Sequence, residues 1–362
     1  MNIIFIAARQ HTNYLGILRV LKKSHNIFFN SIYKSNIEDH KFIKPDILKQ
    51  GILSKFMLFF LSDKYYKFFY FPSFINYFKY LDKVNPDLAI VRIGGRFNFY
   101  LNLIFLSFFK CKILCHEQKN YNRKDLRYTS IKNFLLYLEW CFLSMVFNVR
   151  LFSPIYKRKD KNFYYLPFIT HNNKKKITAN KKTNFISIGK FEKRKNFIFL
   201  LSALKKISFD YSLLIIGENS NQNHNSYLKL LKNYIKLNGL QKRVKILPNI
   251  LHRNIFGYFK NKSLFILPSY NEPASISLLE SISAGIPVLC SDSCGTKTYV
   301  KQNFNGFIFE SNNKKSLVDK INFYVNNKNK FNFYSNNCIN YSKKNLSSDN
   351  FMFYFNKILS SF

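Results

Sequence analysis

The chain has 362 residues, of which 47% are hydrophobic, and its 57 Lys and Arg against 19 Asp and Glu give a formal net charge of +38. This length exceeds one ordinary domain and the apolar content is ample for real cores, so we expect two globular domains and exclude a disordered chain. The charge alone suggests a nucleic-acid-binding protein. However, residues 1–170 hold 27 basic and 10 acidic residues and the remainder hold 30 and 9, so the charge forms no patch. We therefore expect anionic substrates or an anionic membrane surface as partners, and no nucleic acid.

The sequence predicts a cytoplasmic protein, with an option of peripheral contact at the inner face of the cytoplasmic membrane. MNIIFIAAR has no basic region before its apolar stretch, so no secretory signal is predicted. The longest apolar segments, 97–109 and 140–149, are shorter than the ~18 residues of a membrane span. The six cysteines have no CxxC spacing and are expected to be reduced thiols.

Apolar strands alternate with helices through the first half of the chain. NYLGILRVLKKS follows the first strand and has the spacing of a helix. Continuous apolar strands separated by helices predict a parallel sheet that is covered on both faces. The predicted strands are 2–8, 25–33, 87–93, 112–117 and 149–155.

The second half repeats this alternation, with helices predicted at 196–207 and 227–240. The predicted fold class is therefore α/β, with two Rossmann-like doubly wound domains that face each other across a cleft. We expect an N-terminal domain at 1–170, a C-terminal domain at 171–340 and a closing helix in 341–362 that packs back toward the first domain. The boundary is placed at the polar, basic segment 171–182. The predicted strands are 184–190, 211–218, 244–249, 263–269 and 287–292.

The stretch SYNEPASISLLE, at 269–280, places two carboxylates around one turn and the start of one helix in a chain that has few acids. Free N–H groups near Ser275 and Ile276 would make that helix N-terminus a site for an anion. Carboxylates repel phosphate but accept hydrogen bonds from hydroxyl groups well. We therefore expect Glu272 and Glu280 to hold sugar and ribose hydroxyls on either side of a diphosphate.

A second stretch, ISIGKFEKRKN at 186–196, places Lys190 and Lys195 on the loop between a strand and a helix. Two ammonium groups there would stabilise the charge that develops on a departing diphosphate. The chain contains no DxD motif, so we expect no metal ion and no other cofactor.

Residues 184–310 resemble the retaining, nucleotide-sugar-dependent glycosyltransferases of family four, which have the two-domain GT-B fold. Glu272 and Glu280 match the family's E-x7-E signature, and Gly189, Lys190 and Lys195 match its basic loop. LLIIGE, which contains Gly217, matches a strand that ends in glycine. AGIPVLCSDSCGTKTYVKQNFNGFIF resembles the stretch that follows the second glutamate. The sequence departs from the family at four places, which are Lys190 for the commoner Arg, Asn196 for Gly, Pro273-Ala274-Ser275 for a glycine-bearing turn, and Thr298 for Glu.

The resemblance implies a hexosyltransferase that moves a hexose or a derivative from a nucleoside-diphosphate sugar to a glycan or lipid-linked acceptor, with retention of configuration. It also implies a setting in bacterial surface polysaccharide biosynthesis. His116 follows a strand at the place where many members carry a residue close to the donor sugar. The implied catalytic residues are Glu272, Lys190, Lys195 and His116, and the implied donor-binding residues are Glu280, Gly189, Ser275, Ile276 and Gly217.

Acceptor and membrane contacts are predicted in the first half. Arg9, His11 and Arg96 lie near strand ends that should open on the cleft, and Gly16 lies in the expected N-terminal loop. Residues 54–83 mix Lys with Phe and Tyr. They form either a surface that docks on anionic lipid or an ordinary pair of helices in a chain rich in these residues.

Three other functions remain open at this point. A nucleic-acid-binding protein would need a concentrated basic face. A sugar-nucleotide epimerase of the same fold would need acid–base residues at the anomeric and neighbouring carbons and no acceptor, and release of nucleoside diphosphate without epimerised product would exclude it. An inactive partner subunit would explain the departures from the family pattern.

Overall fold

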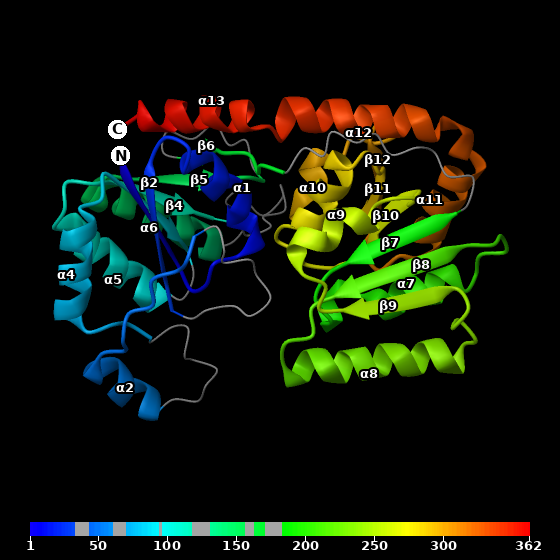
Figure 1. Ribbon diagram of the computed structural model, residues 1–362, viewed down its shortest axis with the longest axis horizontal. Helices are drawn as coiled ribbons and strands as arrows, with labels where there is room; N and C mark the ends of the chain where they lie inside the picture. Colours follow the sequence, from blue (N-terminus) through cyan, green and yellow to red (C-terminus); the bar gives the residue numbers. More distant parts are fainter. Residues whose placement is uncertain (33–42, 61–69, 94–95, 118–130, 156–162, 171–182) are drawn as a thin grey trace. The chain divides into compact units, whose positions relative to one another are not determined.

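The computed structural model describes residues 1–362 except 33–42, 61–69, 94–95, 118–130, 156–162 and 171–182. The described residues separate into two compact units. Unit 1 holds those of 1–168 together with 351–362, and unit 2 holds those of 169–350. Each unit contains one six-stranded parallel sheet (Figure 1). The predicted α/β class with two Rossmann-like sheets is confirmed, while the linker predicted at 171–182 lies outside the described residues.

The sheet of unit 1 has the strand order β2-β1-β3-β4-β5-β6. The five strands expected from apolar runs are present, and a sixth, β6, was not predicted. Its residues FYY are only half-buried, so they give no continuous apolar run. The strands are β1 (Asn2–Ala7), β2 (Asn26–Ser31), β3 (Leu88–Arg92), β4 (Lys112–His116), β5 (Val149–Ser153) and β6 (Phe163–Tyr165).

The helices of unit 1 cover this sheet, and the inner sides of three of them build its main core. Tyr77, Leu103 and Leu143, from three successive helices, pack in one cluster with buried strand residues. The helix predicted over NYLGILRVLKKS is confirmed as α1, which begins at Thr12 and contains Gly16, so the N-terminal loop expected to carry Gly16 is shorter than predicted. The helices are α1 (Thr12–Leu21), α2 (Ile52–Phe59), α4 (Phe74–Val84), α5 (Arg96–Ser107), α6 (Ile131–Phe147) and α13 (Ser348–Leu359).

The sheet of unit 2 has the strand order β12-β11-β10-β7-β8-β9. The chain runs outward from β7 to β9, returns to β10 beside β7, and then runs outward on the other side. This is the strand order of a doubly wound dinucleotide-binding fold. The strands are β7 (Asn184–Ile188), β8 (Ser212–Gly217), β9 (Val244–Pro248), β10 (Leu264–Leu267), β11 (Val288–Ser291) and β12 (Gly306–Phe309).

Strand β12 was not predicted as a strand, and its first residue explains why it fits beside β11. A Cβ atom on Gly306 would lie 2.3 Å from the carbonyl oxygen of Val288 and 2.7 Å from its Cγ2. Gly306 pairs with Val288 in the sheet. Only glycine therefore permits this close approach of the two strands.

The helices of unit 2 include two, α11 and α12, that the sequence analysis did not identify. Their sequences are rich in Asn and Lys, and α12 buries Phe331, Tyr334 and Cys338 together with two serines. The segment 341–362 is also not one helix, because α12 ends at Asn345 and α13 begins at Ser348. The helices are α7 (Phe197–Leu204), α8 (Gln222–Leu237), α9 (Ile255–Tyr258), α10 (Ile276–Ser283), α11 (Lys314–Asn326) and α12 (Phe331–Asn345).

Residues 351–362 pack on unit 1. Arg150 donates a hydrogen bond of 2.7 Å to the carbonyl oxygen of Ser361, and its guanidinium lies 4.8 Å from the centre of the Phe362 ring. Lys112 donates to the carbonyl oxygen of Leu359 at 3.2 Å. These contacts hold the C-terminal residues against β4 and β5. Within the described ranges, no helix is long and apolar enough to cross a membrane.

Candidate active site

Strands β7 and β10 lie side by side in unit 2, and the chain leaves them toward opposite edges of the sheet. In doubly wound sheets, ligands bind outside the carboxyl ends of the strands at such a switch point. The loop after β7 carries Lys190 and Lys195, and the loop after β10 carries Glu272. The strand order therefore places the stretches 186–196 and 269–280, which the sequence analysis selected, beside each other.

Glu272 is held between two basic side chains. Its Oε2 accepts hydrogen bonds from Nη1 of Arg194, at 2.7 Å, and from Nζ of Lys195. Glu272 is only 3% exposed and Lys195 only 6%. A buried carboxylate is tolerated only when such partners compensate its lost hydration. The predicted proximity of Glu272 and Lys195 is thus present, and Arg194 joins them.

The loop after β7 is shaped to deliver these cations. A short 3-10 helix, Lys193–Lys195, ends at Asn196, whose φ of 57° is left-handed. Asparagine adopts that conformation more readily than most residues, so it can replace the glycine that is usual in the family. A Cβ atom on Gly189 would lie 2.9 Å from Cδ of Lys195, so the glycine leaves room for the lysine side chain.

Lys190 faces a different carboxylate. Its Nζ lies 3.1 Å and 3.3 Å from the two carboxylate oxygens of Glu218, which directly follows β8. The two lysines predicted as one pair are therefore each bonded to a separate acid. The sequence analysis did not select Glu218 or Arg194, although both lie in or beside the stretches that it quoted.

Glu280 is buried in α10, one turn after the start of that helix, and contacts a histidine. Its Oε1 lies 2.5 Å from Nε2 of His252, which begins a short 3-10 helix after β9. A lone histidine 28 residues upstream gives no signal in the sequence. The other carboxylate oxygen of Glu280, Oε2, has no hydrogen-bond partner among the described residues.

The N-terminus of α10 makes hydrogen bonds within the protein through Ser275. Ser275 is the N-cap residue, and its side chain accepts a hydrogen bond from the N–H of Leu278. Its own N–H donates to Oγ1 of Thr296 at 3.4 Å, and its predicted contact with the donor stays a prediction. Ile276 is the first helical residue and is half-buried.

Gly217, predicted as a donor-binding residue, has a packing role. A Cβ atom on it would lie 2.5 Å from Cζ of Phe191, whose ring is fully buried. The glycine at the end of β8 therefore makes room for the loop that carries the basic residues.

In unit 1, His116 ends β4 and is buried. Its Nδ1 lies 3.1 Å from the hydroxyl of Tyr14, and its ring stacks on Phe152 with the centroids 4.6 Å apart. Its Nε2 has no hydrogen-bond partner among the described residues. Burial lowers the pKa of His116 well below its ordinary value of 6.5, and the positive charge of Arg92 adds to this shift as the smaller cause. The ring is therefore neutral, with one nitrogen left for a ligand.

The stability of the protein should depend on pH through His116. The pKa is lower in the folded state than in the unfolded state, so this histidine destabilises the fold as the pH falls below about 6.5. Replacing His116 with Phe removes this term, at most ~1.4 kcal/mol per pH unit. Thermal unfolding of both proteins, from about pH 7.5 down to about pH 5.5, should show the native protein losing stability faster. Parallel melting curves would contradict a buried neutral His116.

The acceptor candidates lie in several places in unit 1. Arg9 follows β1 and is half-buried. His11 is the N-cap residue of α1, where its Nδ1 accepts a hydrogen bond from the N–H of Asn13 at 3.2 Å. Gly16 is inside α1, and Arg96 begins α5. Their predicted contact with an acceptor stays a prediction.

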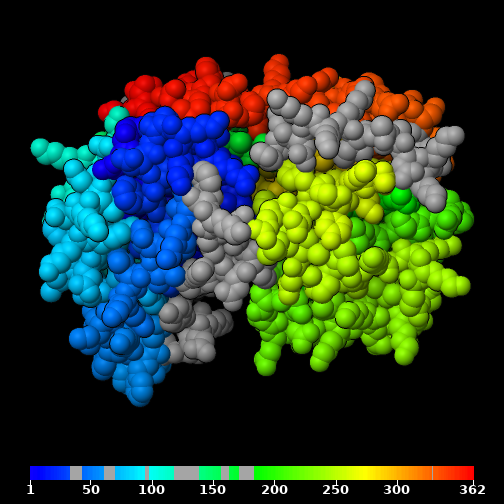
Figure 2. All heavy atoms as spheres, in the orientation of Figure 1, coloured from blue at the N-terminus to red at the C-terminus, as the bar shows by residue number. Residues whose placement is uncertain are grey.

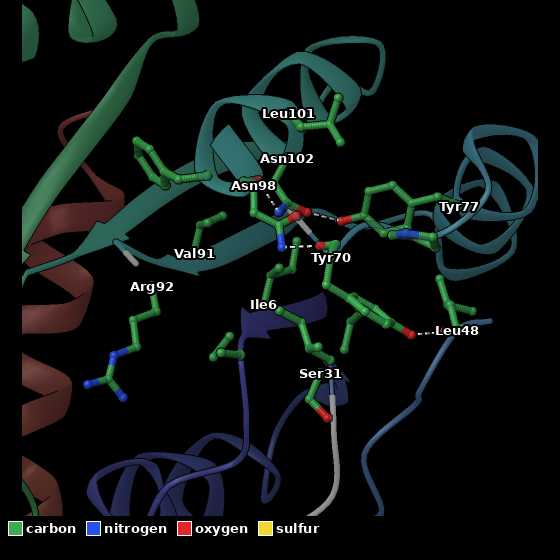
Figure 3. A pocket seen from close by; sticks show the side chains of 16 residues that line it. Ile6, Ser31, Leu48, Tyr70, Tyr77, Val91, Arg92, Asn98, Leu101 and Asn102 are labelled. Carbon is green, nitrogen blue, oxygen red and sulfur yellow. Dashed lines mark hydrogen bonds between the residues drawn. The ribbon is translucent and has the colours of Figure 1, made fainter. Parts of the chain in front are cut away.

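Unit 1 also contains a cavity of about 150 Å³ at the carboxyl ends of β1, β2 and β3 (Figure 3). Its polar groups bond to one another, since Tyr77 donates to Asn102 and Asn98 donates to the carbonyl oxygen of Tyr70. Arg92 lies at one side of it. Arg9, His11 and Gly16 are not among the described residues that line this cavity.

Comparison with known protein families shows which family unit 2 is similar to. Residues 169–345 match the protein-family model described as "Glycosyl transferases group 1", and these bounds nearly coincide with those of unit 2. Unit 2 is therefore similar to a glycosyl transferases group 1 domain over nearly its whole length. The resemblance seen in the sequence is confirmed to this extent. In the described part of the group 1 domain, no cluster of three or more His, Cys, Asp or Glu side chains is placed to hold a metal ion.

Curated relatives match mainly over part of their length. One, from Escherichia coli, is named UDP-Gal:alpha-D-GlcNAc-diphosphoundecaprenol alpha-1,3-galactosyltransferase; it is 29% identical over 180 residues, which is 46% of this chain and 43% of that protein. An uncharacterized glycosyltransferase of Haemophilus influenzae is 27% identical over 158 residues, or 42% of each chain. The chain therefore spans about two fifths of the length of these two relatives.

Solved structures match over the whole chain. Alr3699/HepE of Anabaena, in complex with UDP and glucose, has a TM-score of 0.76 at 13% identity and covers 99% of both chains. A glycosyltransferase of Rickettsia africae has a TM-score of 0.74 at 15% identity, with 99% of this chain and 98% of its own covered. At these identities the likeness shows the fold alone, which is the GT-B fold that includes the group 1 domain.

Proposed function

We propose that the protein is a glycosyltransferase that moves a hexose or a derivative from a nucleoside-diphosphate sugar to a glycan or lipid-linked acceptor. The observation that carries the proposal is the cluster of buried Glu272, buried Lys195 and partly exposed Arg194 at the switch point of the group 1 domain. It combines a hydroxyl-binding carboxylate with two phosphate-binding cations. A nucleoside-diphosphate sugar carries both kinds of group next to each other.

The cluster suggests how binding and catalysis would be coupled. Without a ligand, Lys195 and Arg194 neutralise Glu272. A diphosphate would compete for the same two cations, since phosphate oxygens suit both. Glu272 would then accept hydrogen bonds from hydroxyls of the donor sugar. Lys190, Lys195 and Arg194 would stabilise the leaving diphosphate. No metal ion is part of this proposal, because the basic side chains supply the positive charge.

Glu280 would accept hydrogen bonds from the ribose. His252 contacts only one of its carboxylate oxygens, Oε1, so it would hold the carboxylate in a fixed orientation. In the same proposal, the neutral His116 would offer Nε2 to a hydroxyl of the donor sugar. The family resemblance further favours retention of configuration, with attack on the face of the departing phosphate.

The acceptor side of the proposal is a glycan or a lipid-linked sugar in bacterial surface polysaccharide assembly. A curated relative named for a diphosphoundecaprenol-linked substrate, and another named as an O-antigen biosynthesis glycosyltransferase, support this setting. The net charge of +38 adds contact with an anionic membrane surface to the proposal.

The proposal predicts that one nucleoside diphosphate stabilises the protein against heat. A ligand at ~100 times its Kd should add roughly 2.7 kcal/mol to the free energy of unfolding. UDP is tested first, because solved structures of the same fold contain it, and is followed by GDP, ADP and dTDP. Replacing Glu280 with Gln should weaken binding about tenfold or more, because a charged acceptor of the ribose hydroxyls is lost.

The matched control is Asp319→Asn. This variant removes an exposed carboxylate on α11 that contacts none of the site residues named above, so it should leave the thermal shift with the nucleotide unchanged. Absence of a shift with every nucleotide would contradict the proposal. A shift with duplex DNA that disappears at high salt would favour nucleic-acid binding instead.

A further inference from the structure

The outer surface of the helix layer in unit 1 is unusually apolar. Helices α4, α5 and α6 share one core with the sheet through Leu81, Leu106 and Leu143, so their opposite sides face outward. On these outward sides, and on α2, lie most of the strongly exposed large apolar residues of the described chain. We call this surface the apolar face. An exposed apolar surface of this extent normally marks an interaction site.

Helix α2 is the most exposed part of the apolar face, and its surface projects at the lower edge of unit 1 (Figures 1 and 2). Ile52 is 86% exposed and Phe59 is 84% exposed, while Ser54 is the only buried residue of the helix. An isolated helix of eight residues is marginal in water. The chain thus presents a short helix that buries little of its apolar surface in unit 1, with the rings of Phe56 and Phe59 in contact with Phe60.

The start of α2 is tied to the start of α4. The N–H of Gly51 donates to the carbonyl oxygen of Phe71 at 3.1 Å, and the ring of Phe71 stacks on that of Phe74. A Cβ atom on Gly51 would lie 3.0 Å from the backbone of Pro72 and Ser73, so this junction is close. The position of α2 beside the helix layer therefore rests on backbone contacts.

The apolar face continues across α4 and the end of α5. The ring of Phe78 contacts those of Phe108 and Phe109, with centroids 6.3 Å and 5.3 Å apart. Phe108 is 70% exposed, and Ile75 on α4 is similarly exposed. These side chains form a continuous aromatic ridge.

Helix α6 completes the face with a stripe at helical spacing. Leu138, Phe142, Met145 and Val146 are all exposed and recur at i, i+4, i+7 and i+8. Such a stripe ordinarily faces a protein core. On α6 the stripe faces outward instead. Helix α6 contacts α5, which carries part of the aromatic ridge, through the rings of Trp140 and Phe99.

The charges around the apolar face indicate what covers it. Exposed Lys55 lies on α2, Lys79 on α4 and Lys110 just after α5. The described acids on these helices are exposed Asp82 on α4 and half-buried Glu139 on α6, which accepts a hydrogen bond from Tyr100. A second copy of the chain would bring the same basic side chains against one another. An anionic bilayer instead offers apolar chains for the phenylalanines and negative headgroups for the lysines.

We propose that the apolar face of α2, α4, α5 and α6 docks on a bilayer that contains anionic lipid, with the phenylalanines of α2 inserted among the headgroups. The inference rests on the proposed function in one respect, since a lipid-linked acceptor would hold the reaction at such a surface. It goes beyond the segment 54–83 singled out in the sequence, because α5 and α6 contribute to the face.

The single tryptophan of the chain, Trp140, is half-buried on α6, the helix that carries the exposed stripe, and serves as the fluorescence reporter. The full-length protein is mixed with vesicles of phosphatidylcholine and with vesicles that also contain phosphatidylglycerol, and bound protein is measured by sedimentation. We expect binding only to the anionic vesicles and quenching of Trp140 fluorescence by brominated acyl chains. The variant Phe56→Ser/Phe59→Ser/Phe60→Ser should bind at least about tenfold more weakly.

A matched control is the variant Leu237→Ser/Phe333→Ser/Phe353→Ser, which removes three exposed apolar side chains outside the apolar face and should bind as the native protein does. Equal binding to both kinds of vesicle, no quenching of Trp140, or unchanged binding of the α2 variant would each overturn the proposal. So would a dimer in equilibrium sedimentation that the α2 variant dissociates. The thermal shift with UDP is measured on the same samples, so failure of docking stays distinguishable from failure of the nucleotide site.

Discussion

Replacing Glu272 with Gln is expected to lower the kcat for sugar transfer by about 100- to 1,000-fold while nucleotide binding is kept. The amide preserves the shape of the side chain but loses the charged acceptor that the proposal assigns to the donor sugar. At the same time, Lys195 and Arg194 lose their competing carboxylate and should bind the diphosphate at least as tightly as before. Transfer rates and the Kd for the nucleotide, measured with the donor that the thermal screen identifies, test both parts.

The matched control for this substitution is Glu192→Gln. Glu192 also contacts Arg194, with Nη2 and Oε1 2.6 Å apart, but its side chain is far less buried than that of Glu272. Its loss should leave kcat nearly unchanged. A fall of kcat in both variants by the same factor would mean that the cluster acts only by positioning Arg194. Native activity of the Glu272 variant would remove the proposed catalytic role.

Replacing Gly306 with Ala is expected to cause the largest loss of stability of any single methyl group added to unit 2. The added Cβ would meet the backbone oxygen of Val288 at 2.3 Å, and a backbone atom in a sheet cannot move away as a flexible side chain can. Overpacking of this kind costs typically 1–3 kcal/mol and more when backbone must shift. A fall of several degrees in the melting temperature should follow.

Gly257 offers the control, because a Cβ atom there would meet nothing within 4 Å. Gly257 lies inside α9, where alanine favours the helix by up to about 1 kcal/mol. The Gly257→Ala protein should therefore melt at the same or a slightly higher temperature. Equal melting temperatures for the two variants would show that β12 can move away from β11 at little cost.

The alternation of apolar strands and helices predicted most of both sheets, because strands buried on both faces give continuous apolar runs. It failed where that physical signal is absent. Strand β6 is a half-buried edge strand of three residues, and helices α11 and α12 are rich in Asn and Lys. The helical spacing of NYLGILRVLKKS is confirmed by α1, while the placement of Gly16 in the preceding loop is wrong, because an isolated glycine can sit within a helix at moderate cost.

The candidate site was predictable where spacing along the chain carries the chemistry. Glu272, Glu280 and the basic loop all lie in short stretches, and the structure brings Glu272 and Lys195 into contact. His252 could not be found in this way, because its contact with Glu280 depends on the fold alone. Gly217 also has a packing reason that its motif does not reveal, since a Cβ atom there would meet the ring of Phe191.

The division of the chain between the units has a consequence for synthesis. Unit 2 lies as an insertion within unit 1, because the residues that follow 350 return to the first sheet. A ribosome therefore releases all of unit 2 before it releases the residues whose Ser361 carbonyl accepts from Arg150. Domains generally fold as units while the chain emerges. The second unit to be started is thus the first that can be finished, and β5 must wait for its contacts with Ser361 and Phe362 until unit 2 has been made.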